Sequence, residues 1–508
     1  MTFPFILLWR QIRMYQWKSY IILATVFALS VNLLRAQQAD NAVDSLPATE
    51  QSATVLRYIP NYTLPQANTG STFLIAAITV SGNKKTRSNI VLREVPFKPG
   101  LSFSLSQLIE LFQQGEQQLM NTALFHSARI YASKFEGNCL EIKVEVVERW
   151  YLFPFPFFDL VDRNINQWLI DQKASLQRVN YGLKLLYNNT TGHNDKLRLW
   201  LINGYTRELS ISYEKPYFDR KMQWGFRLAA RTGRGREINY NTIADKQVFL
   251  RTPGFIRSFA SVGGELTYRK KLFARHNLGI YYFREKVEDT VLLANPDYFR
   301  VPGRLNQSPE FYYQFTYAKM DYIPYPREGF ATRVRASKLG ITPAFNLWQL
   351  HWQTMKVWPL GLKNILTLES YAGIKLPFKQ PYVNRRFLGY EEIFMRGFEY
   401  NVVDGVAGGY VRSSIARELF RVNIPLPGFV RKRASISTVP FRVFGKLYSN
   451  AGYVYSPEPG FNFLQNKFLH AAGFGIDILS LYDLTIRIEY SFNNFGQNGL
   501  FLHRTSSF

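Results

Sequence analysis

The chain has 508 residues, which is enough for more than one domain. Its mean hydropathy is slightly negative, and after the N-terminal region no uninterrupted apolar run of about 18 residues occurs, which argues against helical membrane spans. The single cysteine, Cys139, excludes an intramolecular disulfide and a cysteine-based zinc site.

Aromatic residues and positive charges are both abundant. There are 31 Tyr and 41 Phe, more than a soluble core needs, and aromatic girdles at two membrane interfaces would use them. The net charge is +25, but Lys and Arg are spread over the whole chain, with no basic helix or basic-aromatic platform. This distribution suits polar walls and loops beside anionic lipid headgroups, so we expect a lipid bilayer and no nucleic acid as a partner.

Residues 1–36 have the pattern of an export signal. Lys18 precedes the apolar run 21–34, and the small residue Ala36 offers a cleavage point. Met14 is an alternative start to Met1, and an uncleaved anchor helix is the alternative interpretation. Residues 37–72 are rich in Gln, Ala, Ser, Thr, Asn and Pro without periodicity, which predicts a flexible linker.

Residues 73–149 combine strand and helix patterns in a small α+β module. We expect a strand over 74–80, a short helix capped by Thr86, and a strand over 127–133. In the last strand, alternate apolar side chains point one way: Leu140, Ile142, Val144 and Val146. The order strand, helix, helix, strand, strand predicts a three-stranded sheet with two helices on one face.

The second helix of this module has a start signal and an apolar stripe. Ser104 and Gln107 form a capping box, because the serine accepts from a helical N–H while the glutamine reaches back. The helix has apolar residues on one predicted stripe: Leu105, Leu108, Ile109, Phe112 and Leu119.

The same module resembles a polypeptide-transport-associated (POTRA) domain. Its segments VSGNKKT, PFKPGLSFS, NTALFHSARI and KVEVVERW carry the resemblance, which covers residues 73–149. The resemblance implies a periplasmic domain that adds client polypeptide strands to its sheet edge through backbone groups. Because such pairing uses backbone groups, no single side chain can be named as the site of client contact. The alternative interpretation is a generic α+β domain without a client.

Residues 150–508 change to short segments of alternating apolar and polar residues. Examples are 209–213, 474–478 and 484–492. A soluble sandwich has similar alternation, but charges on the polar faces and long polar loops such as 232–245 favour a membrane barrel.

The length of this region sets the expected number of strands. At about 22 residues per strand and connection, residues 150–508 predict about 16 antiparallel strands. The predicted fold class is therefore an all-β transmembrane barrel preceded by one small α+β POTRA-like domain.

A Gly-rich loop at residues 387–409 contains the triplet Arg396, Gly397 and Phe398. Together with the POTRA-like module and the alternating region, this triplet resembles loop six of the BamA/TamA superfamily of outer-membrane assembly and secretion barrels. The resemblance implies that the loop folds back into the barrel lumen, where the arginine contacts acidic residues of late strands. It also implies that the terminal aromatic, Phe508, is part of the barrel assembly signal.

Three side chains are candidate partners of Arg396. A guanidinium inside a narrow polar lumen needs a carboxylate partner. By the alternation of their segments, Asp477 and Glu489 lie on inward faces of late strands. Asn450 stands where members of the superfamily often carry Asp, which leaves the exact partner open. A loop arginine that faces solvent is the alternative.

The sequence favours a protein without catalytic chemistry. It has no GxSxG, HExxH or P-loop motif and no histidine spacing typical of a metal site, so we expect no enzyme activity, no cofactor and no metal. The resemblance implies a factor in the outer membrane of a Gram-negative bacterium that inserts or translocates unfolded β-rich client polypeptides, with possible accessory assembly proteins. The alternative is a passive outer-membrane channel or a surface adhesin that uses the same barrel.

Overall fold

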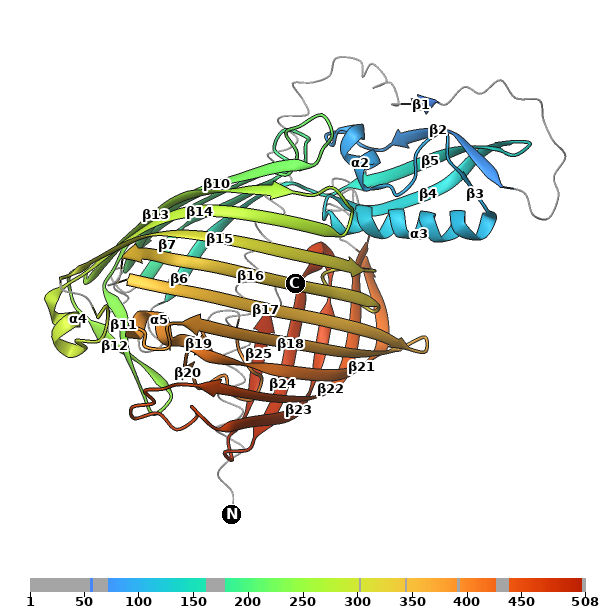
Figure 1. Cartoon of the computed structure of the whole chain (residues 1–508). Coiled ribbons are helices and arrows are strands. Elements are labelled where there is room, and N and C mark those ends of the chain that lie inside the picture. Colours follow the sequence, from blue (N-terminus) through green and yellow to red (C-terminus); the bar gives the residue numbers. More distant parts are fainter. Residues whose placement is uncertain are drawn as a thin grey trace. The chain divides into compact units, whose positions relative to one another are not determined.

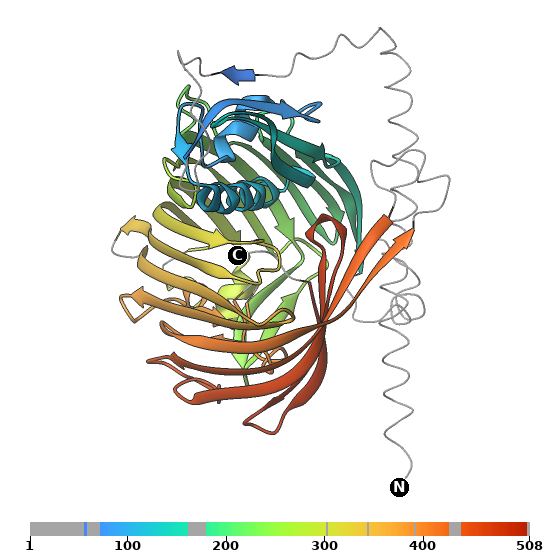
Figure 2. The ribbon, with the colours of Figure 1, turned by 90° about the vertical axis from the view of Figure 1, so that its right-hand side faces the viewer.

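The computed structural model describes residues 55–57, 72–160, 179–300, 303–342, 345–390, 393–425 and 438–504 (Figures 1 and 2). The predicted export signal, most of the predicted linker and Phe508 lie outside these residues. The chain divides into two units. One unit holds the module and nearly all of the strands, and the other, residues 1–53 with 422–441, is described only at the ends of two strands. No helix in the described residues is long and apolar enough to cross a membrane.

The N-terminal module has the predicted order of its main elements. These are β2 (Phe73–Ser81), α2 (Ser88–Glu94), α3 (Leu105–Asn121), β4 (Phe125–Glu136) and β5 (Cys139–Glu148). The sheet order is β1-β2-β5-β4, with β5 parallel to β2 and antiparallel to β4. Figure 1 shows α3 lying along β4.

Two short strands extend this sheet beyond the predicted three. β1 (Val55–Arg57) pairs with β2, although it falls within the predicted linker, and β3 (Ser102–Phe103) also pairs with β2. Both are too short to show alternation, so only the pairing with β2 reveals them. As a result, β4 is the long strand at the edge of this sheet, whereas β2 and β5 are flanked on both sides.

The module's core confirms most of the predicted packing. The four alternate residues of β5 are buried together with Ile75, Leu108 and Leu119. However, Leu105 and Ile109 are 58% and 53% exposed, so the predicted stripe is wrong for these two residues. Leu105 lies in the first turn of α3, and Ile109 points about 90° away from the buried face.

Local signals at the two helix starts had different outcomes. The capping box is confirmed, because Gln107 N lies 3.4 Å from Ser104 Oγ and Ser104 N lies 2.9 Å from Gln107 Oε1. Thr86 does not cap α2, whose N-cap is Arg87 without a side-chain hydrogen bond. The Thr86 hydroxyl instead lies 3.0 Å from the Tyr151 hydroxyl and accepts from Asn189 Nδ2 at 2.9 Å, so tertiary partners take it.

The predicted 16 strands are confirmed as one sheet in which each strand pairs with its neighbours in chain order. The first eight strands are β6 (Leu152–Leu160), β7 (Val179–Asn188), β8 (Lys196–Gly204), β9 (Thr206–Lys215), β10 (Trp224–Gly235), β13 (Arg257–Tyr268), β14 (Ala274–Val287) and β15 (Leu305–Met320). The last eight are β16 (Gly329–Thr342), β17 (Phe345–Leu360), β18 (Asn364–Leu376), β21 (Ala407–Pro425), β22 (Thr438–Tyr455), β23 (Phe468–Leu479), β24 (Thr485–Asn493) and β25 (Asn498–Arg504). This is the antiparallel sheet expected for a transmembrane barrel.

The two faces of the sheet have opposite character. Apolar residues such as Leu209, Phe474 and Ile476 are exposed on one face, whereas Asp477 and Glu489 are buried on the other. This is the alternation expected when one face meets lipid and the other lines a polar interior. Among the described residues no pairing joins β25 to β6, so these two strands are the edges of the sheet.

The predicted polar loop at 232–245 is wrong. β10 continues to Gly235, and β11 (Glu237–Ile243) then forms a hairpin with β12 (Lys246–Arg251). Ile238 is buried in a cluster with Tyr298, in the connection after α4 (Asp289–Ala294), and with Tyr382 of α5 (Tyr382–Arg385). The polar composition of this segment did not indicate a hairpin, because the buried residues that the hairpin packs against lie far away in the sequence.

Candidate functional site

The Gly-rich loop is held on a short hairpin stem after β18. β19 (Arg386–Leu388) pairs with β20 (Val403–Asp404), and the triplet lies between them. Met395 and Phe398 are buried in one apolar cluster with residues of neighbouring strands, namely Tyr371, Tyr410, Val454, Leu469 and Ala471. The triplet is therefore packed against the inner face of the sheet.

Arg396 is buried and faces a carboxylate. Its side chain is 5% exposed, and its Nη1 lies 3.4 Å from Glu489 Oε1. Its guanidinium also lies 4.5 Å from the centre of the Tyr448 ring, a favourable cation–π geometry. Its Nε and Nη2 have no hydrogen-bond partner among the described residues.

Backbone contacts fix the rest of the triplet. Asn450 Nδ2 donates to the Arg396 carbonyl at 3.3 Å, and Asn493 Nδ2 donates to the Gly397 carbonyl at 2.8 Å. Gly397 has a φ of +87°, and a Cβ there would lie 2.5 Å from the Cβ of Ala471. This position therefore requires glycine both for its backbone and for its close approach to β23.

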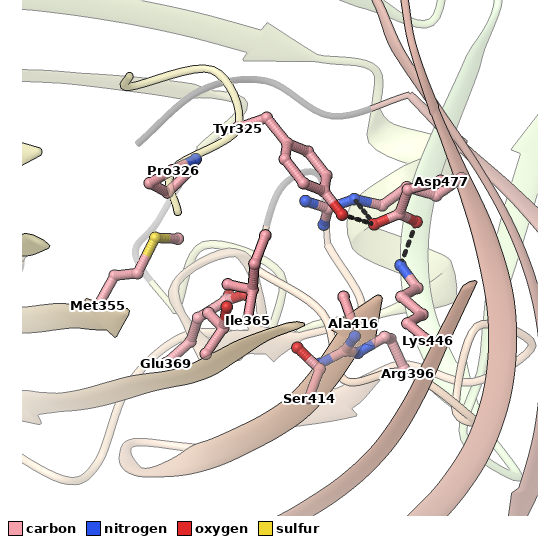
Figure 3. A pocket seen from close by; sticks show the side chains of 12 residues that line it. Tyr325, Pro326, Met355, Ile365, Glu369, Arg396, Ser414, Ala416, Lys446 and Asp477 are labelled. Atoms are coloured by element: carbon pink, nitrogen blue, oxygen red, sulfur yellow. Dashed lines mark hydrogen bonds and ion pairs between the residues drawn. The ribbon is translucent and has the colours of Figure 1, made fainter. Parts of the chain in front are cut away.

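Asp477 has a different partner, which the sequence did not predict. Lys446 Nζ of β22 lies 2.5 Å from Asp477 Oδ1 (Figure 3). The same nitrogen lies 2.8 Å from Glu489 Oε1. The Tyr325 hydroxyl donates to Asp477 Oδ2 at 3.1 Å, and Arg487 Nε lies 3.8 Å from the same oxygen. Alternation along β22 places Lys446 on the same inward face as Tyr448 and Asn450. This alternation is the sequence pattern that could have predicted Lys446 as a member of the site.

The structure thus brings Arg396 to Glu489 and to Asn450, but it pairs Asp477 with Lys446. A second ion pair, Arg412 with Glu369, joins β21 to β18 beside them. Some of these charged groups line a pocket together with apolar and polar neighbours. Its lining residues are Tyr325, Pro326, Met355, Ile365, Thr367, Glu369, Arg396, Ser414, Ala416, Lys446, Asp477 and Arg487 (Figure 3). Chemically, the arrangement is a network of compensated buried charges that holds a loop in place.

The loop also contacts the last strand of the sheet. His503 Nε2 of β25 lies 3.2 Å from Glu399 Oε1 and 3.4 Å from Glu489 Oε2. The ring of Phe394 stacks on His503 at 4.8 Å, and Tyr400 packs on Phe501 at 5.0 Å. The position of β25 is therefore tied to the docked loop.

Two ion pairs link the POTRA-like module to turns of the sheet. Arg149 donates to both carboxylate oxygens of Asp483, at 2.7 and 3.1 Å, in the turn η3 (Leu481–Asp483) before β24. Glu94 of α2 accepts from both Nη atoms of Arg269, at 2.5 and 2.7 Å, in the turn after β13. Burial alone raises the pKa of Glu94, but the Arg269 guanidinium outweighs it and holds this pKa below its ordinary value.

Comparison with known proteins identifies the small domain. Residues 73–149 match the family model POTRA, described as a surface antigen variable number repeat. Similar solved structures include BamA from Haemophilus ducreyi lacking POTRA domains 1–3, with 14% identity, 87% of this chain and 85% of that chain covered, and a TM-score of 0.48. CdiB from Escherichia coli has 12% identity, 94% and 96% coverage, and a TM-score of 0.44. No curated protein matches the chain by sequence.

A POTRA domain followed by a 16-stranded antiparallel sheet defines the class of this protein. The expected POTRA domain is confirmed. Together with the sheet, it gives the chain an architecture of one POTRA domain followed by 16 antiparallel strands.

Proposed function

We propose that this protein is a non-enzymatic outer-membrane factor that inserts or translocates unfolded β-rich polypeptides, with its POTRA domain in the periplasm of a Gram-negative bacterium. The observation that carries the proposal is a POTRA domain followed directly by a 16-stranded sheet whose first and last strands are each paired on one side only among the described residues. In lipid, every strand edge must find a partner, so two such edges make a seam that another strand enters.

The POTRA sheet supplies the first contact with a client in this proposal. β4 is its long edge strand, and Tyr131 and Phe135 on it are exposed. Part of this edge is covered, because the Ile130 N–H donates to Glu116 Oε1 of α3 at 2.7 Å. A client strand would therefore add along the part of β4 beyond Ile130. Cross-linkers that test this contact belong on β4, since β2 and β5 are flanked on both sides.

Reconstitution into liposomes tests the proposed function. A urea-unfolded eight-stranded outer-membrane barrel serves as the client, and its folding is read from heat-modifiable, protease-resistant product. We expect the intact protein to raise the folding rate about tenfold over empty liposomes, and a variant lacking residues 73–149 to lose most of this gain. Equal rates in all three preparations would refute the proposal, and ion conductance without any effect on the client would favour the passive channel.

A further inference from the structure

Four cations gather at one end of the sheet, on strands β9, β10 and β14. Arg207 lies at the start of β9, directly opposite Arg234 near the end of β10. Lys286 lies on the same row two strands further along, because Arg234 pairs with Ser258 and Ser258 pairs with Lys286. Arg284 is two residues deeper on β14. These four residues share one face of the sheet, and we call them the cation patch.

The cation patch lies at the end of the sheet remote from the POTRA domain. At the opposite end of β9, the Tyr217 hydroxyl donates to Glu94 of the POTRA domain at 3.2 Å. Arg269, in the turn after β13, pairs with the same carboxylate. Because neighbouring strands are antiparallel, the start of β9 and the ends of β10 and β14 lie away from these contacts. With the POTRA domain in the periplasm, as proposed above, the patch lies on the external side of the membrane.

The face that carries the patch is the one that meets lipid. Further along the same face, the outward side chains are apolar and between 47% and 59% exposed, as in Leu209, Leu228, Val262 and Ile280. On β9, the apolar stretch ends at Arg207 on one side and at Lys215 on the other. Cations at the border of an exposed apolar band lie at the level of the lipid headgroups.

No carboxylate of these strands balances the patch. The strands β9, β10, β13 and β14 are described in full, and none of their outward-facing residues is acidic. The acidic residues nearby already have partners: the pairs are Glu208–Arg231, Glu285–Arg257, Glu237–Arg251 and Glu288–Arg304. Within the described residues, the four cations of the patch therefore have no ion-pair partner.

This arrangement favours an anionic ligand. Like charges directly opposite each other on neighbouring strands repel and destabilise the pair, which is the case for Arg207 and Arg234. A phosphate between them removes this repulsion, and the planar guanidinium suits two parallel hydrogen bonds to phosphate oxygens. The guanidinium of Arg207 also lies 5.1 Å from the centre of the Phe255 ring, a cation–π contact that holds it beside the strand.

The spacing of the patch suits two phosphates. Arg207 and Arg234 form one pair, and Arg284 and Lys286 form the other on β14. The two pairs are separated by about two and a half interstrand spacings, or about 12 Å. One phosphate cannot reach both pairs, whereas two phosphates at the opposite ends of a disaccharide can.

We propose that the cation patch binds the two phosphates of a bisphosphorylated glycolipid in the membrane leaflet remote from the POTRA domain. Each pair of cations holds one phosphate, and the acyl chains of the lipid lie along the exposed apolar rows below. The inference needs a sheet that lies in a bilayer, and it is independent of how client polypeptides are handled. It therefore goes beyond the proposed function.

Lipid binding in detergent tests this site. The full-length protein, in dodecylmaltoside with EDTA, is titrated with diphosphoryl lipid A and with monophosphoryl lipid A. Native mass spectrometry counts the lipid that stays bound. We expect the diphosphoryl lipid to bind about 25-fold more tightly, at about fivefold for each of the two additional cations that it engages.

Two double variants show whether the patch is the site. Arg284→Gln with Lys286→Gln should lower the affinity for the diphosphoryl lipid about 25-fold and leave the two lipids within about threefold of each other. The matched control is Lys215→Gln with Lys319→Gln, which removes two outward-facing cations at the other end of the sheet. This control should change the affinity less than about twofold, because its charges lie far from the patch. Both variants should keep the heat-modifiable, protease-resistant form of the parent protein.

Three results would overturn the inference. The first is an equal affinity of the parent protein for the two lipids. The second is an equal loss of affinity in the patch variant and in the control, which would reduce the effect to net charge. The third is displacement of the lipid by millimolar inorganic phosphate, which would assign the patch to free phosphate.

Discussion

At the scale of single residues, Lys446 is the central charge of the buried network. It contacts both Asp477 and Glu489, which are 3% and 1% exposed. Lys446→Met would leave Asp477 with Arg487 at 3.8 Å and Glu489 with Arg396 at 3.4 Å. We expect a loss of about 3–5 kcal/mol in the free energy of unfolding, the range for an uncompensated buried charge.

Arg396→Ala should cost less, about 1–2 kcal/mol, because Lys446 still compensates Glu489 at 2.8 Å. Urea unfolding in detergent measures both variants. The control is Arg231→Ala, whose guanidinium is 52% exposed and pairs with Glu208, and which should change the stability by about 0–1 kcal/mol. A larger loss for Arg396→Ala than for Lys446→Met would contradict this ranking of the two cations.

We predict that Arg396 matters more for the folding of clients than for the stability of the protein itself. Arg396→Ala should lower the rate of client folding in liposomes more than Arg396→Lys, because lysine keeps the charge but not the planar guanidinium over Tyr448. Arg231→Ala again serves as the control. Glu399 is unsuited to that purpose, since it accepts from Gly397 N at 2.8 Å and contacts His503. If Arg396→Ala supports client folding at the wild-type rate, the arginine contributes only to packing.

Sequence alone located part of this site. Alternation placed Asp477 and Glu489 on the inward face because a strand fixes side-chain direction at every second residue. Which cation reaches which acid depends on side-chain length and on the register between strands, and neither is visible in one sequence. Lys446 was missed for this reason, although it lies on the same face as Asn450. The role of Phe508 stays a prediction, because that residue lies outside the described part of the chain.

At the scale of elements, the contact between α2 and the turn after β13 should respond to pH. The pKa of Glu94 is lowered in the folded protein, so its pairing with Arg269 stabilises the fold above the ordinary carboxyl pKa of about 4.3. That contribution is lost as the pH falls from there through the lowered value. We therefore expect the melting temperature in detergent to lose little of this contribution between pH 7 and about pH 5, and to fall as the pH is lowered further, below about 4.3.

Glu94→Gln is the matched variant for this prediction. It should lower the stability at pH 7 by about 1.5–3 kcal/mol, the worth of hydrogen bonds to a charged group, and it should flatten the dependence on pH. The same pH dependence in the variant and in the parent protein would assign the effect to other carboxylates.

Elements with local signals were predictable, and those with distant partners were not. The capping box of α3 and the alternation of β5 are decided within a few residues, and both are confirmed. The hairpin β11–β12 packs against Tyr298 and Tyr382, which are distant in the sequence. The hydroxyl of Thr86 forms its hydrogen bonds with Tyr151 and Asn189 and does not cap α2. In each of these cases, a long-range contact overrode the local pattern.

At the scale of the whole molecule, the POTRA domain and the sheet are joined by specific contacts as well as by the chain. Besides the two ion pairs, Asn121 Nδ2 donates to the Met320 carbonyl at 3.0 Å. Each of the 16 strands still pairs only with other strands of this sheet, so we expect the sheet to remain folded without residues 73–149. The count of about 16 strands was predictable from length, because it depends only on the average of about 22 residues per strand and connection, although single strands range from the 7 residues of β25 to the 19 of β21.

In the proposed function, a client passes through the seam between β6 and β25. Arg149, just before β6, and Asp483, in the turn before β24, lie on the two sides of that seam and contact each other. Arg149→Cys with Asp483→Cys, in the Cys139→Ser background, allows a short cleavable bis-maleimide to tie the two sides together. The folding rate of the unfolded barrel in liposomes is then measured before linking, after linking and after cleavage of the linker. We expect that linking abolishes the gain over empty liposomes and that cleavage restores it. Either single-cysteine variant should be unaffected by the reagent. An unchanged folding rate in the fully linked protein would contradict passage through the seam.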